Sequence, residues 1–181
     1  MNLVAWATHE ATSKLATALP RRWLHVQGVF QRAAIAQPLF SQSDGELLAA
    51  AAILHDIGYA PDLVRSGFHP LDGALFLNSI GAPEIVTQLV AYHSCALIEA
   101  RVRHLTPDLN EFPIPPAPLL EALTWADMTT TPAGEATDAV SRIDEILERY
   151  SDNIVISTAI NEAKDELLDC VARVEARLGQ G

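Results

Sequence analysis

Side chains that can bind a metal ion occur along the chain in the order His, His-Asp, Asp. They are His25, the adjacent pair His55 and Asp56, and Asp127. Imidazole nitrogens and carboxylate oxygens suit divalent Mn, Fe, Co, Ni and Zn, and carboxylates also suit Mg. An aspartate in the apolar segment around Asp127 is costly to bury without a charged partner. The pattern therefore predicts a centre for one or two divalent ions, with a packed, hydrogen-bonded histidine as the alternative interpretation of His25.

A family resemblance rests on the residues around the His-Asp pair. The segment Leu54-His55-Asp56-Ile57-Gly58 resembles the HDIG form of the motif that names the HD superfamily of metal-dependent phosphohydrolases. Residues 69–74, which read HPLDGA, and residues 91–94, which read AYHS, are similar to two further stretches of its two-metal members. The resemblance covers about residues 20–130. It implies an all-α HD-domain bundle with a metal site between helices, whose ligands are His25, His55, Asp56 and Asp127.

The same resemblance implies roles for His69 and His93. Each would bind a second ion or contact a substrate phosphate, and helix capping is the alternative interpretation. Asp56 would bridge two ions, so Asp56, His69 and His93 are the candidate catalytic residues. The implied activity is hydrolysis of a phosphoester or phosphoanhydride bond in a nucleotide or another small phosphorylated metabolite. A divalent ion suits this reaction because it lowers the pKa of water and polarises a phosphoryl oxygen.

Two other classes of protein fit the same ligands. Some HD proteins hold two irons with six such residues and activate oxygen, and a metal-bound regulatory module would have no turnover. Cyclic-di-GMP phosphodiesterases of the HD-GYP group are disfavoured, because Ser94 stands where they have a second adjacent His. His104 cannot replace that residue within a continuous helix, since the rise from His93 is about 16 Å. We therefore expect His104 at the surface.

Charge limits the class of partner. The formal net charge of −11 disfavours nucleic acid and anionic membranes and favours a small-molecule substrate, which the resemblance implies is phosphorylated. Yet six of the ten arginines lie within the segment that carries the motifs. Arg21, Arg22 and Arg65 are therefore candidates for charge-assisted contacts to phosphate. Thr130, which follows Asp127, is a candidate substrate contact, with a helix-ending turn as the alternative.

The apolar spacing is helical through most of the chain and predicts an all-α fold. Helices are expected over about residues 3–19, 20–37, 44–58, 70–80, 83–103, 119–128, 135–150 and 153–178, with a cap at Ser43 or Asp44. His55 and Asp56 would then lie in the last turn of a helix that ends at Gly58. Residues 106–118 include five prolines and are expected to form a loop at the edge of a pocket.

One domain is expected over residues 1–181, with a motif-bearing core over about 20–130 and C-terminal helices over about 135–179. Those helices are expected to pack on the core, and a homodimer interface is the alternative. The two cysteines, Cys95 and Cys170, predict no disulfide framework, and Cys95 is expected to be packed rather than to bind metal. Without a leader-like N-terminus or an apolar run of about 18 residues, a cytoplasmic protein is expected.

Overall fold

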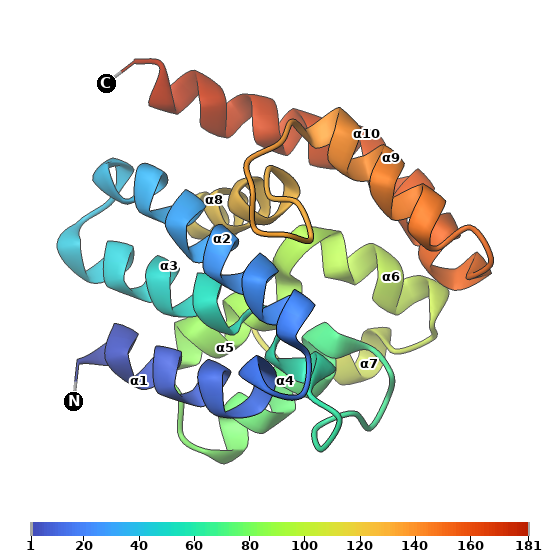
Figure 1. The fold of residues 1–181 in the computed structure, drawn as a ribbon, viewed down its shortest axis with the longest axis horizontal. Coiled ribbons are helices and arrows are strands. Elements are labelled where there is room, and N and C mark those ends of the chain that lie inside the picture. The colour runs from blue at the N-terminus through green and yellow to red at the C-terminus, as the bar shows by residue number, and fades with distance from the viewer. Residues whose placement is uncertain (1, 181) are drawn as a thin grey trace.

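The computed structural model describes residues 2–180, which form a bundle of helices with no β-strand (Figure 1). The predicted all-α class is confirmed. The longer helices are α1 (Leu3–Ala11), α2 (Pro20–Ala36), α3 (Gln42–Leu54), α4 (His69–Ser79), α5 (Glu84–Tyr92), α8 (Ala117–Met128), α9 (Ala139–Arg149) and α10 (Ile154–Leu178). The shorter elements are α6 (Ala96–Val102), α7 (Thr106–Leu109), a π-helical turn (Thr12–Ala16) and 3₁₀ turns at Gln37–Leu39, Ile57–Tyr59 and His93–Cys95.

The core is built around α3, in which every residue from Leu48 to Leu54 is buried. Four successive alanines in this run allow neighbouring helices to approach closely, and α3 contacts α1, α2, α5 and α8. The second half of α3 is covered on all sides and needs no polar face, which explains the uniformly apolar run from Leu48 to Leu54. The carboxyl end of α3, where the His-Asp pair follows, therefore lies inside the molecule.

The C-terminal helices α9 and α10 lie along one side of the bundle (Figure 1). Helix α10 contacts α6, α8 and α9. Ile143 from α9 and Leu167 and Val171 from α10 belong to the same apolar core as α3. The expected packing of the C-terminal helices on the core is therefore observed within one chain.

Breaks in two predicted helices place the candidate ligands at helix ends. Helix α3 ends at Leu54 rather than at Gly58, because Asp56 (φ −98°, ψ 10°) leaves the helical conformation. The helix predicted over residues 83–103 is two helices, α5 and α6, separated by Ser94 and Cys95 with φ values of 49° and 60°. Such left-handed conformations cost a non-glycine residue about 1 kcal/mol or more. No glycine or proline marks this break in the sequence.

The other differences from the prediction are local. The N-cap of α3 is Ser41 rather than Ser43 or Asp44, and its hydroxyl accepts a hydrogen bond from the Asp44 N–H. The first predicted helix becomes π-helical near its end, and α9 starts later than predicted. Within the predicted loop at 106–118, Thr106–Leu109 form α7, because Pro107 lies in the first turn, where proline is tolerated.

The loop that follows α7 borders a surface hollow beside α4 and α5, through residues 111–113. These residues do not line the cavity at the candidate site described below. Among residues 2–180, no helix combines the length and the apolar character that crossing a membrane requires.

Gly58 packs directly against the start of α4. A Cβ at this position would lie 2.1 Å from the His69 carbonyl oxygen and 2.5 Å from the Gly73 nitrogen. Gly58→Ala must therefore push the 3₁₀ turn away from α4, and we expect it to lower the free energy of unfolding by about 1–3 kcal/mol. Gly45→Ala is the matched control, because its Cβ would meet Gln37 atoms only at 3.7 Å or more and alanine favours a helix. Urea unfolding followed by circular dichroism measures both, and equal stability of the two variants would contradict this packing.

Candidate metal centre

Three histidines converge on the interior, and each turns the same ring nitrogen towards the backbone. In each, Nδ1 lies beside a backbone carbonyl oxygen: His25 at 3.0 Å from Thr131, His55 at 2.8 Å from Ala52 and His93 at 2.7 Å from Val90. A carbonyl oxygen only accepts hydrogen bonds, so Nδ1 carries the proton and donates it. The Nε2 atoms therefore point into the centre, as they do in histidines that bind metals.

Helix ends explain why two of these rings turn Nδ1 towards the helix that precedes them. His55 follows the last residue of α3, and His93 follows the last residue of α5. The last carbonyls of a helix have no partner within the helix, and each histidine donates to the carbonyl three residues before it. Because α3 and α5 contact each other, the two rings meet. The centroids of the His55 and His93 rings are 5.2 Å apart.

Asp56 lies between two groups of potential ligands. The ligand atoms of His25, His55 and Asp56 lie within 4.8 Å of one another, and so do those of Asp56, His69 and His93. Asp56 Oδ2 is 3.4 Å from His55 Nε2 and 3.8 Å from His25 Nε2, whereas Oδ1 is 3.3 Å from His69 Nε2. His69 Nε2 is 3.1 Å from His93 Nε2. The two carboxylate oxygens of Asp56 therefore face different groups.

Asp127, near the end of α8, lies beside the first group. Its Oδ1 is 3.1 Å from His25 Nε2, and its Oδ2 accepts a hydrogen bond from the Ser94 hydroxyl. Ser94 occupies the left-handed turn between α5 and α6, and its N–H donates to the Thr124 hydroxyl oxygen. The strained turn therefore positions a side chain that holds the Asp127 carboxylate.

The two aspartates keep their negative charges although they are buried. Burial by itself would raise the pKa of each carboxyl group. For Asp56, the Arg22 guanidinium together with His55 and His69 outweighs burial and holds the pKa well below its ordinary value. For Asp127, the neighbouring His25, His55 and Arg142 side chains together have the same effect on the pKa. Both side chains are therefore in the charged form that a metal ligand requires.

A histidine binds a metal ion through its neutral ring, and burial favours this form for two of the candidate histidines. Burial lowers the pKa of His69 well below its ordinary value and also lowers the pKa of His93, which favours neutral rings. Burial acts in the same direction on His55, but Asp56 outweighs it and raises the pKa. The Nε2 atom of His55 is fully buried and has no hydrogen-bond partner. A buried polar atom without a partner costs about 1–3 kcal/mol, and a cation bound between His55 and Asp56 would supply the partner.

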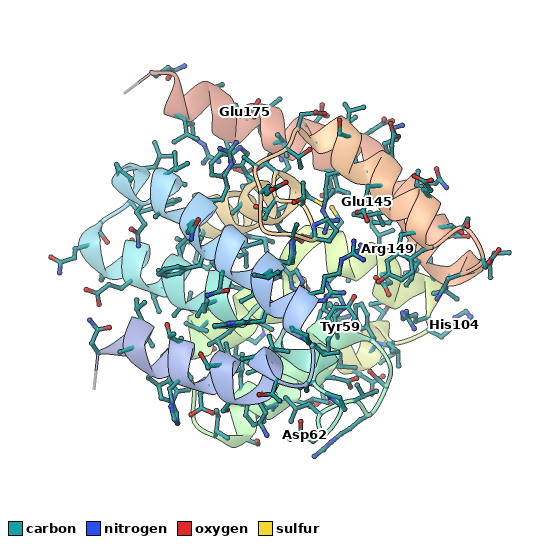
Figure 2. The ribbon with its side chains drawn as sticks, in the orientation of Figure 1. Tyr59, Asp62, His104, Glu145, Arg149 and Glu175 are labelled. Carbon is teal, nitrogen blue, oxygen red and sulfur yellow. The ribbon has the colours of Figure 1, made fainter. Side chains whose placement is uncertain are left out.

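A cavity of about 80 Å³ opens beside the cluster. Arg22 lies at its wall, with Nη1 2.7 Å from Asp56 Oδ2 and the guanidinium 3.9 Å from the centre of the Tyr59 ring. The Tyr59 ring stacks on the His69 ring at 4.0 Å between centroids. Tyr59, which is labelled in Figure 2, was not identified from the sequence. This stack holds Arg22 and His69 on one side of the cavity.

Two arginines from α9, Arg142 and Arg149, also line the cavity and were not identified from the sequence. Arg142 is 4% exposed; its Nη2 lies 3.9 Å from Asp127 Oδ1 and its Nη1 donates to Glu145 at 2.5 Å. A signal for Arg142 is present in the sequence: it interrupts the apolar stripe of an amphipathic helix, one turn before Ile146. A charge on such a stripe requires a buried partner.

The structure brings some predicted substrate contacts to the cluster and not others. Arg22 pairs with Asp56, whereas Arg21 is exposed and borders a neighbouring, larger cavity. Arg65 does not reach the cluster, because it lies on the exposed loop before α4, where its backbone N–H donates to Asp72. Thr130 does not reach it either, because its hydroxyl donates to the Ala126 carbonyl at the end of α8.

Two other residues considered in the sequence lie outside the centre. His104 is exposed, as expected, and lies at the edge of the molecule in Figure 2. Cys95 packs against the main apolar core, and burial raises the pKa of its thiol to about 12. A thiol that stays protonated at neutral pH is a poor metal ligand.

Buried imidazoles and carboxylates at the ends of helices define a centre suited to divalent metal ions in an all-α protein. The family model described as "HD domain" matches residues 22–132, which is more than half of the chain and includes every candidate ligand named above. The chain therefore belongs to the HD domain family, whose superfamily comprises metal-dependent phosphohydrolases. Comparisons with curated proteins and with solved structures returned no match.

We expect the protein to bind two divalent ions per chain, because two ligand groups share Asp56. His69→Asn should reduce the content to one ion by removing a ligand of the second group. His104→Asn is the matched control, since His104 is exposed and asparagine tolerates its positive φ of 61°. Inductively coupled plasma mass spectrometry on anaerobically purified protein gives the stoichiometry. Two ions in the His69→Asn variant would exclude His69 as a required ligand.

Ser94→Ala removes the hydroxyl that holds Asp127 without altering a candidate ligand. Loss of a partner that orients a ligand typically costs about 10–100-fold in metal affinity, and we expect a loss in this range. Ser79→Ala is the control, because the exposed Ser79 hydroxyl only donates to the carbonyl of Phe76 in its own helix. Competition with a chromophoric chelator measures both affinities, and equal dissociation constants would show that Ser94 has no positioning role.

Proposed function

We propose that this protein is a metal-dependent phosphohydrolase that cleaves a phosphoester or phosphoanhydride bond in a nucleotide or another small phosphorylated metabolite. The observation that carries this proposal is the sharing of buried Asp56 by two ligand groups beside a cavity with arginines in its wall. Membership of the HD domain family supports the same class. The proposed ligands are His25, His55, Asp56 and Asp127 for one ion and Asp56, His69 and His93 for the other.

The geometry of His93 favours a ligand over a proton donor to phosphate. Its Nδ1–H is already committed to the Val90 carbonyl, 2.7 Å away. Donation from Nε2 as well would require a positively charged imidazole. His69 Nε2 faces the same space as His93 Nε2, at 3.1 Å. Two lone pairs at this separation are compatible with a cation that both rings bind.

Phosphate binding would fall to the arginines beside the carboxylates. Arg22 and Arg142 each present a planar guanidinium, which donates to phosphate oxygens in a fixed geometry. The chemistry supplied by bound divalent ions is a lowered pKa of water, towards about 7, and polarisation of a phosphoryl oxygen. Met128, Ile146 and Ile160 form an apolar part of the cavity wall. They limit the number of water molecules near the reacting phosphate and so strengthen these electrostatic contacts.

Asp56→Asn should abolish phosphate release, because the asparagine amide lacks the negative charge that Asp56 supplies to both ligand groups. We expect at least about a hundredfold loss of kcat/KM. Asp62→Asn makes the same change at an exposed carboxylate that pairs with Lys14, away from the cavity (Figure 2), and should retain full activity. The assay is phosphate release from a panel of phosphorylated metabolites with Mn, Fe, Co, Ni, Zn or Mg.

Phosphate release, oxygen consumption and metal content, measured on the same protein, separate the candidate classes. Phosphate release that depends on Asp56 supports the proposal. Oxygen consumption by the iron-loaded protein, without phosphate release, would replace it with the di-iron oxygenase class. Full metal occupancy with neither activity would replace it with a metal-bound regulatory module.

A further inference from the structure

A second cavity, of about 360 Å³, adjoins the small cavity at the candidate metal centre. The two cavities share Arg22, Arg142, Arg149 and Tyr150 as lining residues. Its volume lies at the lower end of the range of about 300–1,000 Å³ that is typical of small-molecule sites. A molecule whose reacting phosphate lies at the metal centre can therefore extend into the larger cavity.

The wall of the larger cavity is basic in an acidic protein. Arg21, Arg22, Arg142 and Arg149 line it, and no aspartate or glutamate is among its lining residues in the described part of the chain. The whole chain has a formal net charge of −11. The guanidinium groups therefore make this wall positively charged although the protein as a whole is acidic. A positively charged wall favours an anionic ligand.

Nearby carboxylates compensate only part of this charge. Arg22 pairs with Asp56 at 2.7 Å. Glu145 accepts from Arg142 at 2.5 Å and lies 3.5 Å from Arg149, so one carboxylate serves two arginines. Arg21 makes no ion pair among the described residues. The one other ion pair of these four arginines in that part of the chain joins Arg142 to Asp127 and is long, at 3.9 Å. Positive charge therefore remains in excess along the wall.

Arg142 also has an unused hydrogen-bond donor. Its side chain is 5% exposed, and its buried Nε has no partner among the described residues. Charged groups are rarely buried without complete hydrogen bonding. Because Arg142 lines both cavities, its guanidinium is available to a ligand at their junction.

The arginines divide into two pairs by their neighbours. Arg22 and Arg142 lie beside Asp56 and Asp127 and can contact a phosphate at the metal centre. Within residues 2–180, neither Arg21 nor Arg149 forms an ion pair with a candidate ligand. They are the residues available for a different part of the molecule that enters the site.

The C-terminal segment supplies part of this second site. Arg142 and Arg149 lie two turns apart on one face of α9, and Tyr150 follows directly, all beyond the matched HD domain residues 22–132. Figure 2 shows Glu145 and Arg149 close together beside α9. The larger cavity is thus formed where a segment outside the family match meets the start of α2.

We propose that the substrate carries a second phosphoryl group besides the one that is cleaved, and that Arg21 and Arg149 bind this group in the larger cavity. The proposal rests on the proposed phosphohydrolase function for the role of the first phosphate. Arginine matches phosphate because its planar donors bond two oxygens at once. The substrate class is therefore a small metabolite with at least two phosphoryl groups.

Binding can be tested without catalysis. Isothermal titration calorimetry with inorganic pyrophosphate, on protein kept in EDTA, should detect binding to the wild type. Arg149→Gln should weaken it about tenfold, and the double variant Arg21→Gln/Arg149→Gln about a hundredfold, as expected for charge-assisted hydrogen bonds. Arg173→Gln is the matched control, because Arg173 is exposed, pairs with Glu121 and does not line either cavity.

Malonate, a dicarboxylate probe, should bind at least about tenfold more weakly than pyrophosphate, because its two negative charges are fewer than those of pyrophosphate. No binding of pyrophosphate, or equal binding by the wild type and the double variant, would overturn the second site. Equal binding of malonate and pyrophosphate would overturn its assignment to a phosphoryl group.

Hydrolysis then separates this inference from the proposed function. Wild type should have a higher kcat/KM for 4-phosphonophenyl phosphate than for phenyl phosphate, by about tenfold, and Arg149→Gln should reduce this ratio. Hydrolysis of both compounds without a preference would overturn the second site and leave the phosphohydrolase function standing. Arginine-dependent pyrophosphate binding without hydrolysis of any phosphorylated compound would support the second site and overturn the phosphohydrolase function.

Discussion

The buried negative charge of Asp56 is the constraint on which the arrangement of the centre depends. An isolated carboxylate costs several kcal/mol when it is removed from water. Asp56 is 3% exposed and is stable there because Arg22 from α2, His55 at the end of α3 and His69 from α4 surround it. These partners come from three helices, so the charge requires α2, α3 and α4 to meet at one point.

Backbone conformation at helix ends produces the directions of the ligands. His55 and His93 use the same device, a ring that donates to an unpaired carbonyl at the end of its own helix. The left-handed conformations of Ser94 and Cys95 carry a conformational cost, and the surrounding contacts must repay it. The Ser94 hydrogen bonds to Asp127 and Thr124 are two such contacts, and they tie this turn to α8.

The candidate metal ligands and two of the arginines that line the cavities come from different parts of the chain. The candidate ligands all fall within the segment that matches the HD domain family, at the ends or along the length of α2, α3, α4, α5 and α8. Arg142 and Arg149 come from α9, outside that segment, and add positive charge where the protein as a whole is acidic. In this arrangement one segment holds the centre, and another shapes the space from which a substrate approaches it.

The sequence by itself determined the helical class, most helix positions and the histidines and aspartates that converge on the centre. Helical periodicity and the low cost of burying alanine and leucine are local properties, and a His-Asp pair in an apolar run is visible without coordinates. Local rules failed at Asp56 and Ser94, where contacts from distant helices override the preference to continue a helix.

Only the tertiary structure decided which charged residues meet. Arg22, Arg65 and Arg142 are equivalent as residue types, yet Arg22 pairs with Asp56, Arg65 lies on an exposed loop and Arg142 reaches the cavity from α9. The physical reason is that the field of a charge acts through space and depends on burial, whereas the sequence orders residues only along the chain.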